Sequence, residues 1–571
     1  MAVTRQQKME FARSKARLAA GGLRAFLRFC AAEKRRGTLW KNLQGAFSGA
    51  IEDMSWSDLL EEKAAEIPDK TFLRYREESY TYRQMNENAD RVASYLVSLG
   101  ADNRKGMGIF MRNSPRFLDL YFAAQKCGMY VVPINSELKG DGLLYIINHS
   151  DIEFLAVDAE LLPEIAELPG KMEHIREVIV DDVEEEAKDY KIPKGYRKLS
   201  TAYDFPAKRP PMRYGKDDMV LIMYTSGTTG RPKGVVYTAS RTKVKLLGIV
   251  GGITMKPDDV YYTALALCHG NAMLLTVTQS LHMGATVVLA RKFSASRFWD
   301  DIRRYDVTVF NTIGSIIPIL MKQPESVKDR CHRVRYVLSA ACPTDLWVPF
   351  EERFGVKLFE GYGAVDSGGK GIVNLGTAPP GSLGKPLGKP GSCRIVDEKG
   401  NDVPPGVPGE LIFKVSDKKS SIRYYKNEEA SEKKMRGGWM YTGDLVKRDE
   451  DGYLYFVGRD TESMRKGGEN VSAYEVEHVI RQHPGVEEVA VYAVPSELAE
   501  DEIMAAVKPA AGVTVDPAAL RSYLAGKLAK FAVPRYIRIV SEFPMTQTHR
   551  VIKKELERQG VTTDTYDAQA K

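Results

Sequence analysis

Apolar residues recur along the chain in two patterns, one with the spacing of an amphipathic helix and one forming short continuous runs. Residues 83–100, RQMNENADRVASYLVSLG, carry the helical spacing. Three short apolar runs follow at residues 106–112, 154–158 and 177–182, and each has the length of a buried strand. Because helical and strand-like segments alternate, we expect an α/β fold in which parallel strands form sheet layers.

The pattern changes twice towards the C-terminus. Residues 376–391, GTAPPGSLGKPLGKPG, are rich in proline and glycine and predict a loop, which is followed by the strand-like segments CRIVDEKG and GELIFKV. After Arg459 a glycine-rich turn leads into a helix from about Tyr474 and then into further alternation of helices and strands. A chain of 571 residues is too long for one core. We therefore expect an N-terminal arm at 1–50, a large domain at 51–458 and a small α+β domain at 459–571.

The basic residues of the chain are concentrated in its first 41 positions. These positions hold eleven Lys and Arg against two Glu, a net charge of +9, whereas the whole chain carries +7 and the remainder therefore −2. Because the basic character is confined to this arm, we expect no nucleic-acid partner. On a helical projection, arginines form one stripe of the arm and apolar residues lie on the opposite side. The stripe consists of Arg13, Arg17, Arg24, Arg28 and Arg35, and the apolar residues are Phe11, Leu18, Leu23, Phe26, Leu27 and Phe29.

Two interpretations of this arm stay open. It lies on an anionic membrane surface, or it docks its apolar side on the protein itself, with Gly21 and Gly22 weakening the middle of the helix. No run of eighteen apolar residues predicts a membrane span, and arginines interrupt any signal-peptide core. Six scattered cysteines without a C-x-x-C pair favour a reducing compartment and argue against disulfides and structural zinc. We expect a cytoplasmic protein that, under the first interpretation, touches the inner face of the membrane through residues 1–40.

Residues 223–234, MYTSGTTGRPKG, combine glycines, hydroxyl side chains and one lysine. The apolar run 219–223 precedes them and GVVYT follows, so the polar cluster is expected to form a loop between two strands. Glycines bring backbone N–H groups close to a ligand, hydroxyls add donors, and Lys233 adds a positive charge, which together suit a phosphate chain. A P-loop would need G-x-x-x-x-G-K-[ST] before a helix, but here Pro232 precedes the lysine and Gly234 follows it.

Four later segments carry chemistry of their own. FEGYGAVDSG places Tyr362 between glycines, where its ring can stack on a base, and Asp366 where a carboxylate can hold a metal ion. WMYTGDLVKRDEDGYLYFVGRD offers Asp444 as an acceptor for ribose hydroxyls and ends in Arg459. MRKGGENVSAYEVE is a basic glycine-rich turn before a helix, and FPMTQTHRVIKKEL is a basic tail. Taken singly, Tyr362 also fits a packed aromatic, Asp444 a turn residue and Arg459 a surface ion pair.

The order and spacing of these five segments are more specific than any one of them. From about Ser55 to Glu555 the sequence resembles the adenylate-forming superfamily, which comprises acyl-CoA synthetases, peptide-synthetase adenylation domains and luciferases. It is most similar to bacterial fatty-acyl and carnitine-type CoA ligases related to fatty acid transport proteins. The resemblance assigns to ATP or AMP the residues Thr225, Ser226, Gly227, Thr228, Thr229, Gly230, Lys233, Gly361, Tyr362, Gly363, Asp444 and Arg459. It also assigns a metal ion to Thr225 and Asp366, CoA to Lys466, Gly467, Gly468 and Glu469, the hinge to Thr461, and catalysis to Arg550, Lys233 and His269.

This resemblance implies an ATP-dependent acyl-CoA synthetase that uses Mg²⁺ and takes CoA as a co-substrate. A carboxylate attacks the α-phosphate and releases pyrophosphate, and because both reactants are anionic, Mg²⁺ and cationic side chains must screen their approach. The small domain then swings as a mobile lid, and the CoA thiol attacks the acyl-adenylate. His269 lies where the family lines the carboxylate site, and a purely structural role is the equal alternative for this lone histidine.

Three places depart from the family pattern. Val365 and Asp366 stand where Thr and Glu are usual, so that a hydroxyl is lost and the carboxylate is one methylene shorter. Thr461 replaces the usual hinge Asp or Lys. Arg550 stands where the catalytic lysine is usual, and its guanidinium keeps the charge with a different geometry. The alternative catalytic cations, a helical turn later, are Lys553 and Lys554.

These departures leave three functions open. The protein is an active CoA ligase, an enzyme that passes an acyl-adenylate to a carrier protein, or a non-catalytic member that binds nucleotide or acyl groups. The ATP loop, Asp444 and Arg459 favour catalysis. The apolar segments VKLLGIVGGI, LALCHGNAMLL and NTIGSIIPILM are expected to line the pocket for a small-molecule carboxylic acid, and they admit medium- or long-chain fatty acids as well as aromatic or steroidal ones. The amphipathic arm favours a lipophilic acid, and no pattern bears on the oligomeric state.

Overall fold

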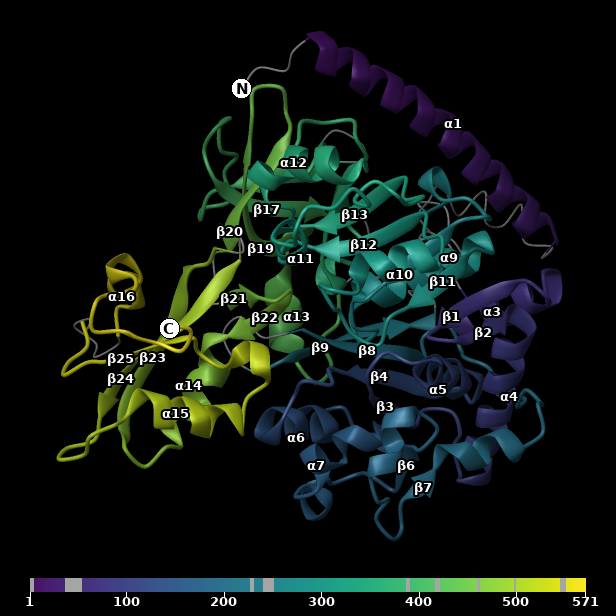
Figure 1. Cartoon of the computed structure of the whole chain (residues 1–571), viewed down its shortest axis with the longest axis horizontal. Helices are drawn as coiled ribbons and strands as arrows, with labels where there is room; N and C mark the ends of the chain where they lie inside the picture. The colour runs from purple at the N-terminus through teal and green to yellow at the C-terminus, as the bar shows by residue number, and fades with distance from the viewer. Residues whose placement is uncertain are drawn as a thin grey trace.

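The chain folds into a large body and a smaller C-terminal unit beside it (Figure 1). The coordinates are a computed structural model. The residues that it describes are 5–35, 54–225, 231–239, 251–386, 391–415, 422–459, 463–497, 500–544 and 551–570. The α/β architecture with parallel sheet layers, predicted from the alternation of helices and strands, is confirmed.

Two mainly parallel sheets form the centre of the large body. One has the strand order β7-β6-β5-β3-β4-β8-β9. Its strands are β3 (Gly106–Phe110), β4 (Tyr130–Ile134), β5 (Ile152–Asp158), β6 (Glu177–Asp181), β7 (Arg197–Lys198), β8 (Met219–Thr225) and β9 (Lys233–Thr238). The other has the order β15-β14-β13-β12-β10-β11-β1-β2. Its strands are β1 (Thr71–Tyr75), β2 (Glu78–Thr81), β10 (Val260–Thr263), β11 (Thr286–Leu289), β12 (Val309–Ile313), β13 (Tyr336–Ala340), β14 (Leu358–Gly363) and β15 (Gly371–Asn374).

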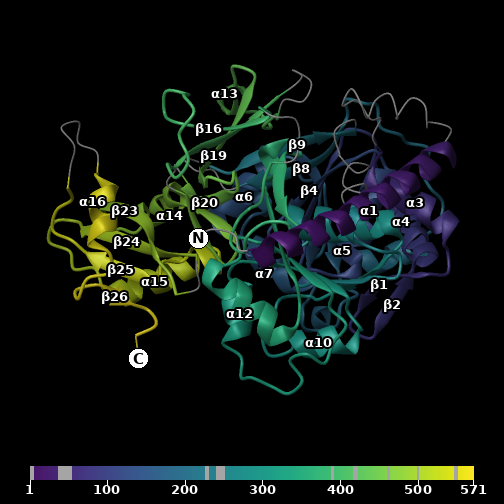
Figure 2. The same ribbon diagram turned by 90° about the horizontal axis from the view of Figure 1, so that it is seen from above.

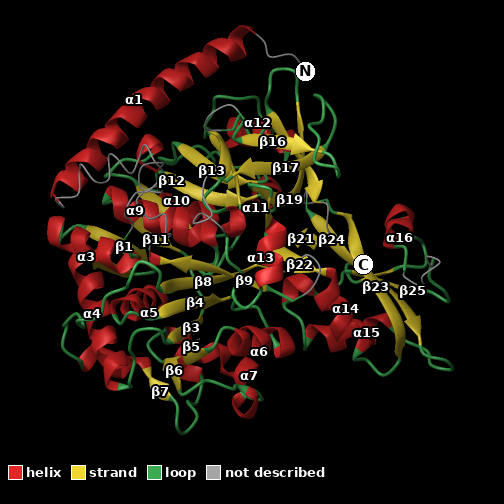
Figure 3. Cartoon of the chain, turned by 180° about the vertical axis from the view of Figure 1, so that it is seen from behind, coloured by secondary structure: helices red, strands yellow, loops and turns green. Residues whose placement is uncertain are grey.

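Helices pack against the faces of these sheets (Figure 3). They are α3 (Trp56–Glu66), α4 (Tyr82–Ser98), α5 (Pro115–Lys126), α6 (Gly140–His149), α7 (Leu162–Ile165), α9 (Thr278–Met283), α10 (Phe298–Arg304), α11 (Ile316–Met321) and α12 (Thr344–Phe354). The sequence fixes several of their ends, because Thr81 forms a capping box with Gln84 at the start of α4 and Ser114 caps α5 just before Pro115. The largest apolar core lies between α3, α4 and α5 and strands of both sheets.

A third sheet, antiparallel, completes the large body. It contains β16 (Cys393–Val396), β17 (Gly409–Lys414), β18 (Met435–Arg436), β19 (Trp439–Arg448) and β20 (Leu454–Arg459), with α13 (Glu428–Lys434) before β18. The strands predicted at CRIVDEKG and GELIFKV are thus confirmed as β16 and β17.

The C-terminal unit has its own sheets and its own apolar core. It contains the hairpin β21 (Ser463–Lys466) and β22 (Glu469–Ser472), the sheet β23 (Val486–Pro495), β24 (Asp501–Pro509), β25 (Tyr536–Ile539) and β26 (Tyr566–Asp567), and the helices α14 (Ala473–Arg481), α15 (Pro517–Ala525) and α16 (Lys553–Gln559). The helix predicted from about Tyr474 is therefore confirmed as α14.

The described residues of the N-terminal arm form one uninterrupted helix, α1 (Arg5–Arg35), along the outside of the large body (Figure 2). The helix continues through Gly21 and Gly22; that these glycines weaken its middle stays a prediction. Gly21 is buried, and a Cβ there would lie 2.3 Å from the carbonyl oxygen of Ile253. At this glycine the helix lies against the backbone of the body and leaves no room for a Cβ.

Candidate functional site

The hairpin β8–β9 holds the first part of the site. Thr225, the last residue of β8, is paired with Lys233, the first residue of β9, and the Thr225 hydroxyl donates to the Lys233 carbonyl at 3.4 Å. The two strands predicted around the MYTSGTTGRPKG loop are confirmed. The remaining loop residues assigned to ATP lie outside the described residues; they are Ser226, Gly227, Thr228, Thr229 and Gly230.

Lys233 lies in a cluster of charged and aromatic side chains. Its ammonium is 5.6 Å from the centre of the Tyr424 ring, and the Tyr424 hydroxyl donates to Asp366 Oδ2 at 2.6 Å. The Lys434 Nζ lies 3.0 Å from the same carboxylate oxygen. Burial, and then the neighbouring charge of Lys434, hold the pKa of Lys233 below its ordinary value. Two lysines with one carboxylate between them make a place where a polyanion such as a phosphate chain is favoured.

Asp366 is the acidic group of this cluster. It lies in the short turn η7 (Val365–Ser367), whose Val365 carbonyl accepts a hydrogen bond from Tyr237 at 2.8 Å. Across the described ranges, no group of three or more His, Cys, Asp or Glu could hold a metal ion by itself. One carboxylate beside a phosphate site nevertheless fits Mg²⁺, which binds through substrate phosphates, water and one or two carboxylates.

The base and ribose residues predicted from the sequence lie together. Tyr362 is in β14 between Gly361 and Gly363, and its hydroxyl donates to Asp444 Oδ2 at 2.6 Å. Asp444 is 4% exposed, and its backbone N–H donates to the Thr442 hydroxyl at 3.1 Å. This places an aromatic face and a carboxylate side by side, as recognition of a nucleoside requires.

Arg459 ends β20 and pairs through its backbone with Asp444 of β19. The antiparallel register of these two strands therefore brings the two predicted ribose residues opposite each other. The Arg459 side chain and the hinge residue Thr461 lie outside the part of the structure that is described.

The glycine-rich turn of the C-terminal unit reaches into the large body. Lys466 and Glu469 are paired at the ends of β21 and β22, and the two glycines between them have φ of +62° and +80°. The Glu469 Oε1 lies 2.6 Å from His269 Nε2 and accepts from Asn135 Nδ2 at 3.0 Å. Lys466 instead pairs with Glu502 at 2.6 Å within its own unit. Of the residues assigned to CoA, Glu469 thus faces the large body and the Lys466 head group does not.

His269 joins the two units. Burial of the ring opposes protonation, but the neighbouring Cys268 and Glu469 side chains together raise the pKa of His269 well above its usual value. In this arrangement the neighbouring Glu469 carboxylate therefore favours the protonated form of the imidazole. A cation at this place can pair with a carboxylate, whether that of Glu469 or that of an acid substrate.

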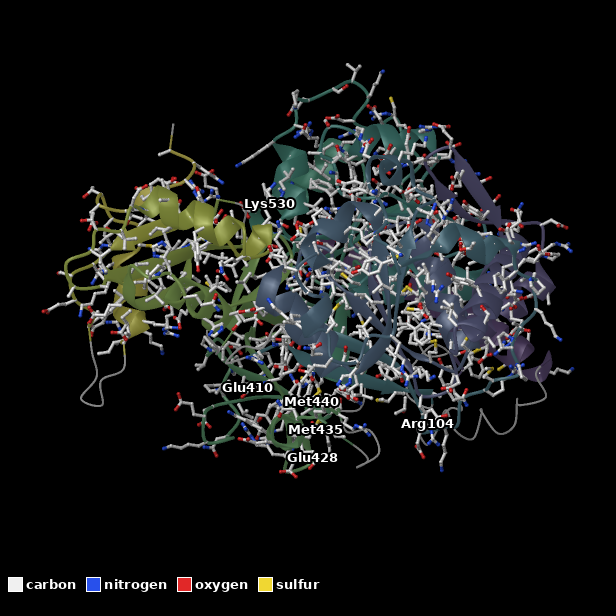
Figure 4. All side chains as sticks on the ribbon, turned by 90° about the horizontal axis from the view of Figure 1, so that it is seen from below. Arg104, Glu410, Glu428, Met435, Met440 and Lys530 are labelled. Atoms are coloured by element: carbon white, nitrogen blue, oxygen red, sulfur yellow. The ribbon has the colours of Figure 1, made fainter. Side chains whose placement is uncertain are left out.

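Two cavities meet at this pair. One, of about 770 Å³, is lined by Lys233, Asp366, Asp444 and the Glu469 turn. The other, of about 570 Å³, lies between the large body and the C-terminal unit and is lined by residues of α6, α14 and the turn that begins at Lys530. Figure 4 shows Lys530 where the C-terminal unit meets the large body. Both cavities are lined by Thr225, His269 and Glu469, so a ligand in one can reach a ligand in the other.

The described lysines of the basic tail lie away from these cavities. Arg550 is outside the described residues. Lys553, the first residue of α16, lies 2.8 Å from Glu477 of α14 within the C-terminal unit, and Lys554 is exposed. In Figures 1 and 2, α16 lies on the side of that unit turned away from the large body.

Sequence reasoning missed Lys434 and Tyr424, which complete the surroundings of Lys233 and Asp366. Both come from the segment YYKNEEASEKKMRGG before β19. A signal was present, because paired lysines a few residues before the Asp444 turn could have been assigned to the same anionic ligand. The pairing with Asp366 depends on contacts 58 and 68 positions apart along the chain, and no local pattern reports such contacts.

Known proteins are similar to this chain in sequence and in fold. The AMP-binding enzyme family matches residues 60–417, and the AMP-binding enzyme C-terminal domain matches residues 475–550. A steroid-22-oyl-CoA synthetase of Rhodococcus jostii is 33% identical over 86% of this chain and 89% of its own. A crotonobetaine/carnitine–CoA ligase of Salmonella paratyphi B is 31% identical over 88% of this chain and 98% of its own. The fold also matches a double mutant of the Bacillus subtilis o-succinylbenzoate CoA synthetase bound to a product analogue, with a TM-score of 0.74, 23% identity, and coverage of 89% of this chain and 99% of that one. The chain therefore belongs to the AMP-binding enzyme family, and within it to the adenylate-forming acyl-CoA ligases, which use ATP, Mg²⁺ and CoA.

Proposed function

We propose that the protein is an acyl-CoA synthetase that activates a lipophilic carboxylic acid, such as a medium- or long-chain fatty acid, through an acyl-adenylate. The observation that carries this proposal is the meeting of the two cavities at His269 and Glu469. One cavity offers groups for a nucleoside and its phosphates, and the other opens between the two units towards the same point. This is the arrangement that a thiol needs in order to reach an adenylate.

In the first half-reaction an oxygen of the acid attacks the α-phosphorus of ATP and the bond to pyrophosphate breaks. Lys233 and Lys434 are placed to hold the negative charge of the phosphates. Thr225 and Asp366 would hold Mg²⁺ together with those phosphates, and the ion would stabilise the leaving pyrophosphate. The His269 imidazole is placed to hold the carboxylate of the acid once Glu469 is withdrawn, because that carboxylate can replace Glu469 as its partner.

In the second half-reaction the thiol sulfur of CoA attacks the acyl carbonyl and AMP leaves with the carboxyl oxygen. The present arrangement suits this step, because Gly468 and the neighbouring Glu469 lie against the large body. Glu469 then takes His269 as its partner, so the histidine no longer holds an acid carboxylate. Arg550 remains our proposed catalytic cation for the first half-reaction, in which the C-terminal unit takes another orientation.

A lipophilic acid is favoured by the segments expected to line its pocket. Residues 265–275 and 311–321 contain no Lys, Arg, Asp or Glu, and their ionisable residues are Cys268 and His269. The first includes most of the π-helix Asn271–Val277 with Met273 and Leu274, and the second continues from β12 into the apolar α11. One relative is named for a steroid acyl group and the other for crotonobetaine and carnitine, so the apolar lining, not the relatives, supports a lipophilic acid.

The test is an acid panel assayed for pyrophosphate release with and without CoA. We expect CoA-dependent turnover in which kcat/KM rises about fourfold for each added methylene until the pocket is filled, since each buried CH₂ contributes about 0.8 kcal/mol. Saturated acids of four to eighteen carbons would be compared with carnitine and with a steroid acid. Turnover of carnitine alone would contradict the lipophilic substrate. Pyrophosphate release without any thioester would instead favour a carrier-protein acceptor.

A further inference from the structure

The N-terminal helix docks on the body through a stripe of small residues. Gly21 and Ala25 are buried against the segment at residues 251–255, where a Cβ on Gly252 would lie 3.0 Å from the Ala25 Cβ. Phe11, Ser14 and Leu18 continue the same stripe and are half-buried. Small side chains let the helix axis approach the surface closely. The arm therefore docks on the protein, but through this stripe and not through the whole apolar side that the second interpretation expected, because Leu23, Phe26 and Leu27 of that side are exposed.

The opposite face of α1 is apolar and exposed. Leu23 is 61% exposed, Phe26 44% and Leu27 57%, and Met9 near the start of the helix is 53% exposed. At 3.6 residues per turn, Leu23, Phe26 and Leu27 point away from Gly21 and Ala25. Four of the thirteen large apolar side chains that are exposed in the described part of the chain lie on this one helix. Such a concentration indicates a surface that is covered when the protein works.

The flank of this exposed face is basic. Arg13, Arg17 and Arg24 are exposed on the side between the docked stripe and the outward face, and the first 41 residues carry a net +9. Two copies of the helix would bring these like charges together, whereas an anionic lipid surface matches both the arginines and the apolar side chains. We propose that α1 is an interfacial helix that binds the protein to an anionic membrane surface through Leu23, Phe26 and Leu27, with its arginine flank on the lipid head groups.

The place of α1 on the body agrees with such a role. Figure 1 shows α1 along the outer edge of the large body, with the C-terminal unit on the opposite side, so a membrane against the helix leaves that unit free to move. The segment at residues 251–255, on which α1 docks, overlaps the end of VKLLGIVGGI, residues 244–253, one of the segments expected to line the acyl pocket. This second point rests on the proposed lipophilic substrate. Among the described helices, none is long and apolar enough to cross a membrane.

Cosedimentation of the full chain with vesicles tests the proposal without any substrate. The vesicles are phosphatidylcholine alone and phosphatidylcholine with one third phosphatidylglycerol. We expect binding to the second kind, weakened more than tenfold by a triple substitution of the outward face, Leu23→Ser, Phe26→Ser and Leu27→Ser. The matched control replaces three valines of similar exposure elsewhere, Val407→Ser, Val513→Ser and Val561→Ser, which are 43%, 45% and 48% exposed. It should bind as the parent does.

A second triple variant tests the charge. The substitutions Arg13→Gln, Arg17→Gln and Arg24→Gln should weaken binding on the order of 100-fold, because each basic residue at an anionic surface contributes about a fivefold factor. Equal binding of the parent and the outward-face variant would overturn the proposal, as would a parent that binds neither vesicle. If the parent binds no vesicle but self-associates, and the outward-face variant does not self-associate, the exposed face of α1 binds a second copy of the chain and the membrane proposal is wrong. Pyrophosphate release on a water-soluble acid checks folding, and its loss in the parent would contradict the proposed activity without touching the membrane result.

Discussion

Lys233 lies near the positively charged Lys434 and the negatively charged Asp366. The contacts of Asp366 show how an aspartate fits where the family usually has a glutamate. The Asp366 carboxylate is held by the Tyr424 hydroxyl and by Lys434 at 2.6 and 3.0 Å. A longer Glu would place its carboxylate about one methylene further out. The Tyr424 hydroxyl and Lys434 thus reach the shorter side chain of Asp366. The replacement of the usual Glu by Asp366 therefore does not argue against a phosphate site.

Three residues of the basic tail are candidates for the catalytic cation: Arg550, Lys553 and Lys554. Lys553 is already paired with Glu477 inside the C-terminal unit, whereas Lys554 is exposed. We predict that Arg550→Ala slows adenylate formation at least 100-fold, because it removes the charge that bridges the carboxylate and the α-phosphate. Thioester formation from a supplied acyl-adenylate should stay within about threefold of the parent, since the tail acts only in the other orientation.

Arg550→Lys measures what the guanidinium adds, since it keeps the charge and loses the fork of donors. Lys553→Ala and Lys554→Ala serve as the matched controls and should adenylate at nearly the parental rate. If one of them fails while Arg550→Ala keeps the parental rate, the register assigned to the tail is wrong and that lysine is the catalytic cation. Single-turnover pyrophosphate release separates these outcomes.

At the scale of elements, the sequence predicts those whose pattern is local. The strand at residues 154–158 and the hairpin β8–β9 follow from apolar runs bounded by polar turns. Helix α5 shows where this reasoning ends. It is buried on all sides, although its sequence contains Arg116, Asp119 and Lys126. Their partners come from distant segments, as when Tyr203 donates to Asp119 Oδ2 at 2.7 Å, and spacing along the chain does not report such contacts.

The burial of α5 has a consequence for stability against pH. Burial raises the pKa of Asp119 to about 7 from its ordinary 3.8, and the nearby Arg116 and the Tyr203 hydrogen bond only partly oppose this. Between these two values the folded chain holds a proton that the unfolded chain has released, so stability falls as pH rises through this window. We predict that Asp119→Asn, which cannot titrate, removes this part of the fall.

The measurement is the midpoint of thermal unfolding at pH 4.5 and 7.5. Relative to the parent, the midpoint of Asp119→Asn should rise by about 2–4 °C between the two pH values. Asp217→Asn, at an exposed position, is the matched control and should follow the parent at both. A constant difference between Asp119→Asn and the parent across the range would mean that this carboxylate does not titrate there in the folded chain.

At the scale of the whole molecule, polar contacts hold the C-terminal unit against the large body. They include the pair of Glu469 and His269 and the hydrogen bond from Gln482 Nε2 to Asp141 Oδ2 at 3.1 Å. Lys322 also lies 3.5 Å from Glu497. Such contacts can be exchanged for contacts with water at small cost, as between domains that move relative to each other. None of them could be predicted from the sequence, because each joins residues far apart in the chain whose meeting depends on the orientation of the two units.

The present orientation brings the second of two consecutive glycines, Gly468, against the large body. Gly467 and Gly468 both have positive φ, so an alanine strains the backbone similarly at either place. Only at Gly468 would the new Cβ meet the large body, 2.0 Å from Cδ1 of Ile313, whereas at Gly467 no atom lies within 4 Å.

We predict that Gly468→Ala slows thioester formation from a supplied acyl-adenylate at least tenfold and leaves single-turnover pyrophosphate release near the parental rate, because the clash exists only in the present orientation. Gly467→Ala is the control for backbone strain and should affect both steps little. Ile313→Ala in the Gly468→Ala background should restore thioester formation, since it removes the atom that clashes. Equal slowing by the two glycine variants, or no rescue by Ile313→Ala, would mean that the turn acts through its own conformation and that the present contact with Ile313 does not form during thioester synthesis.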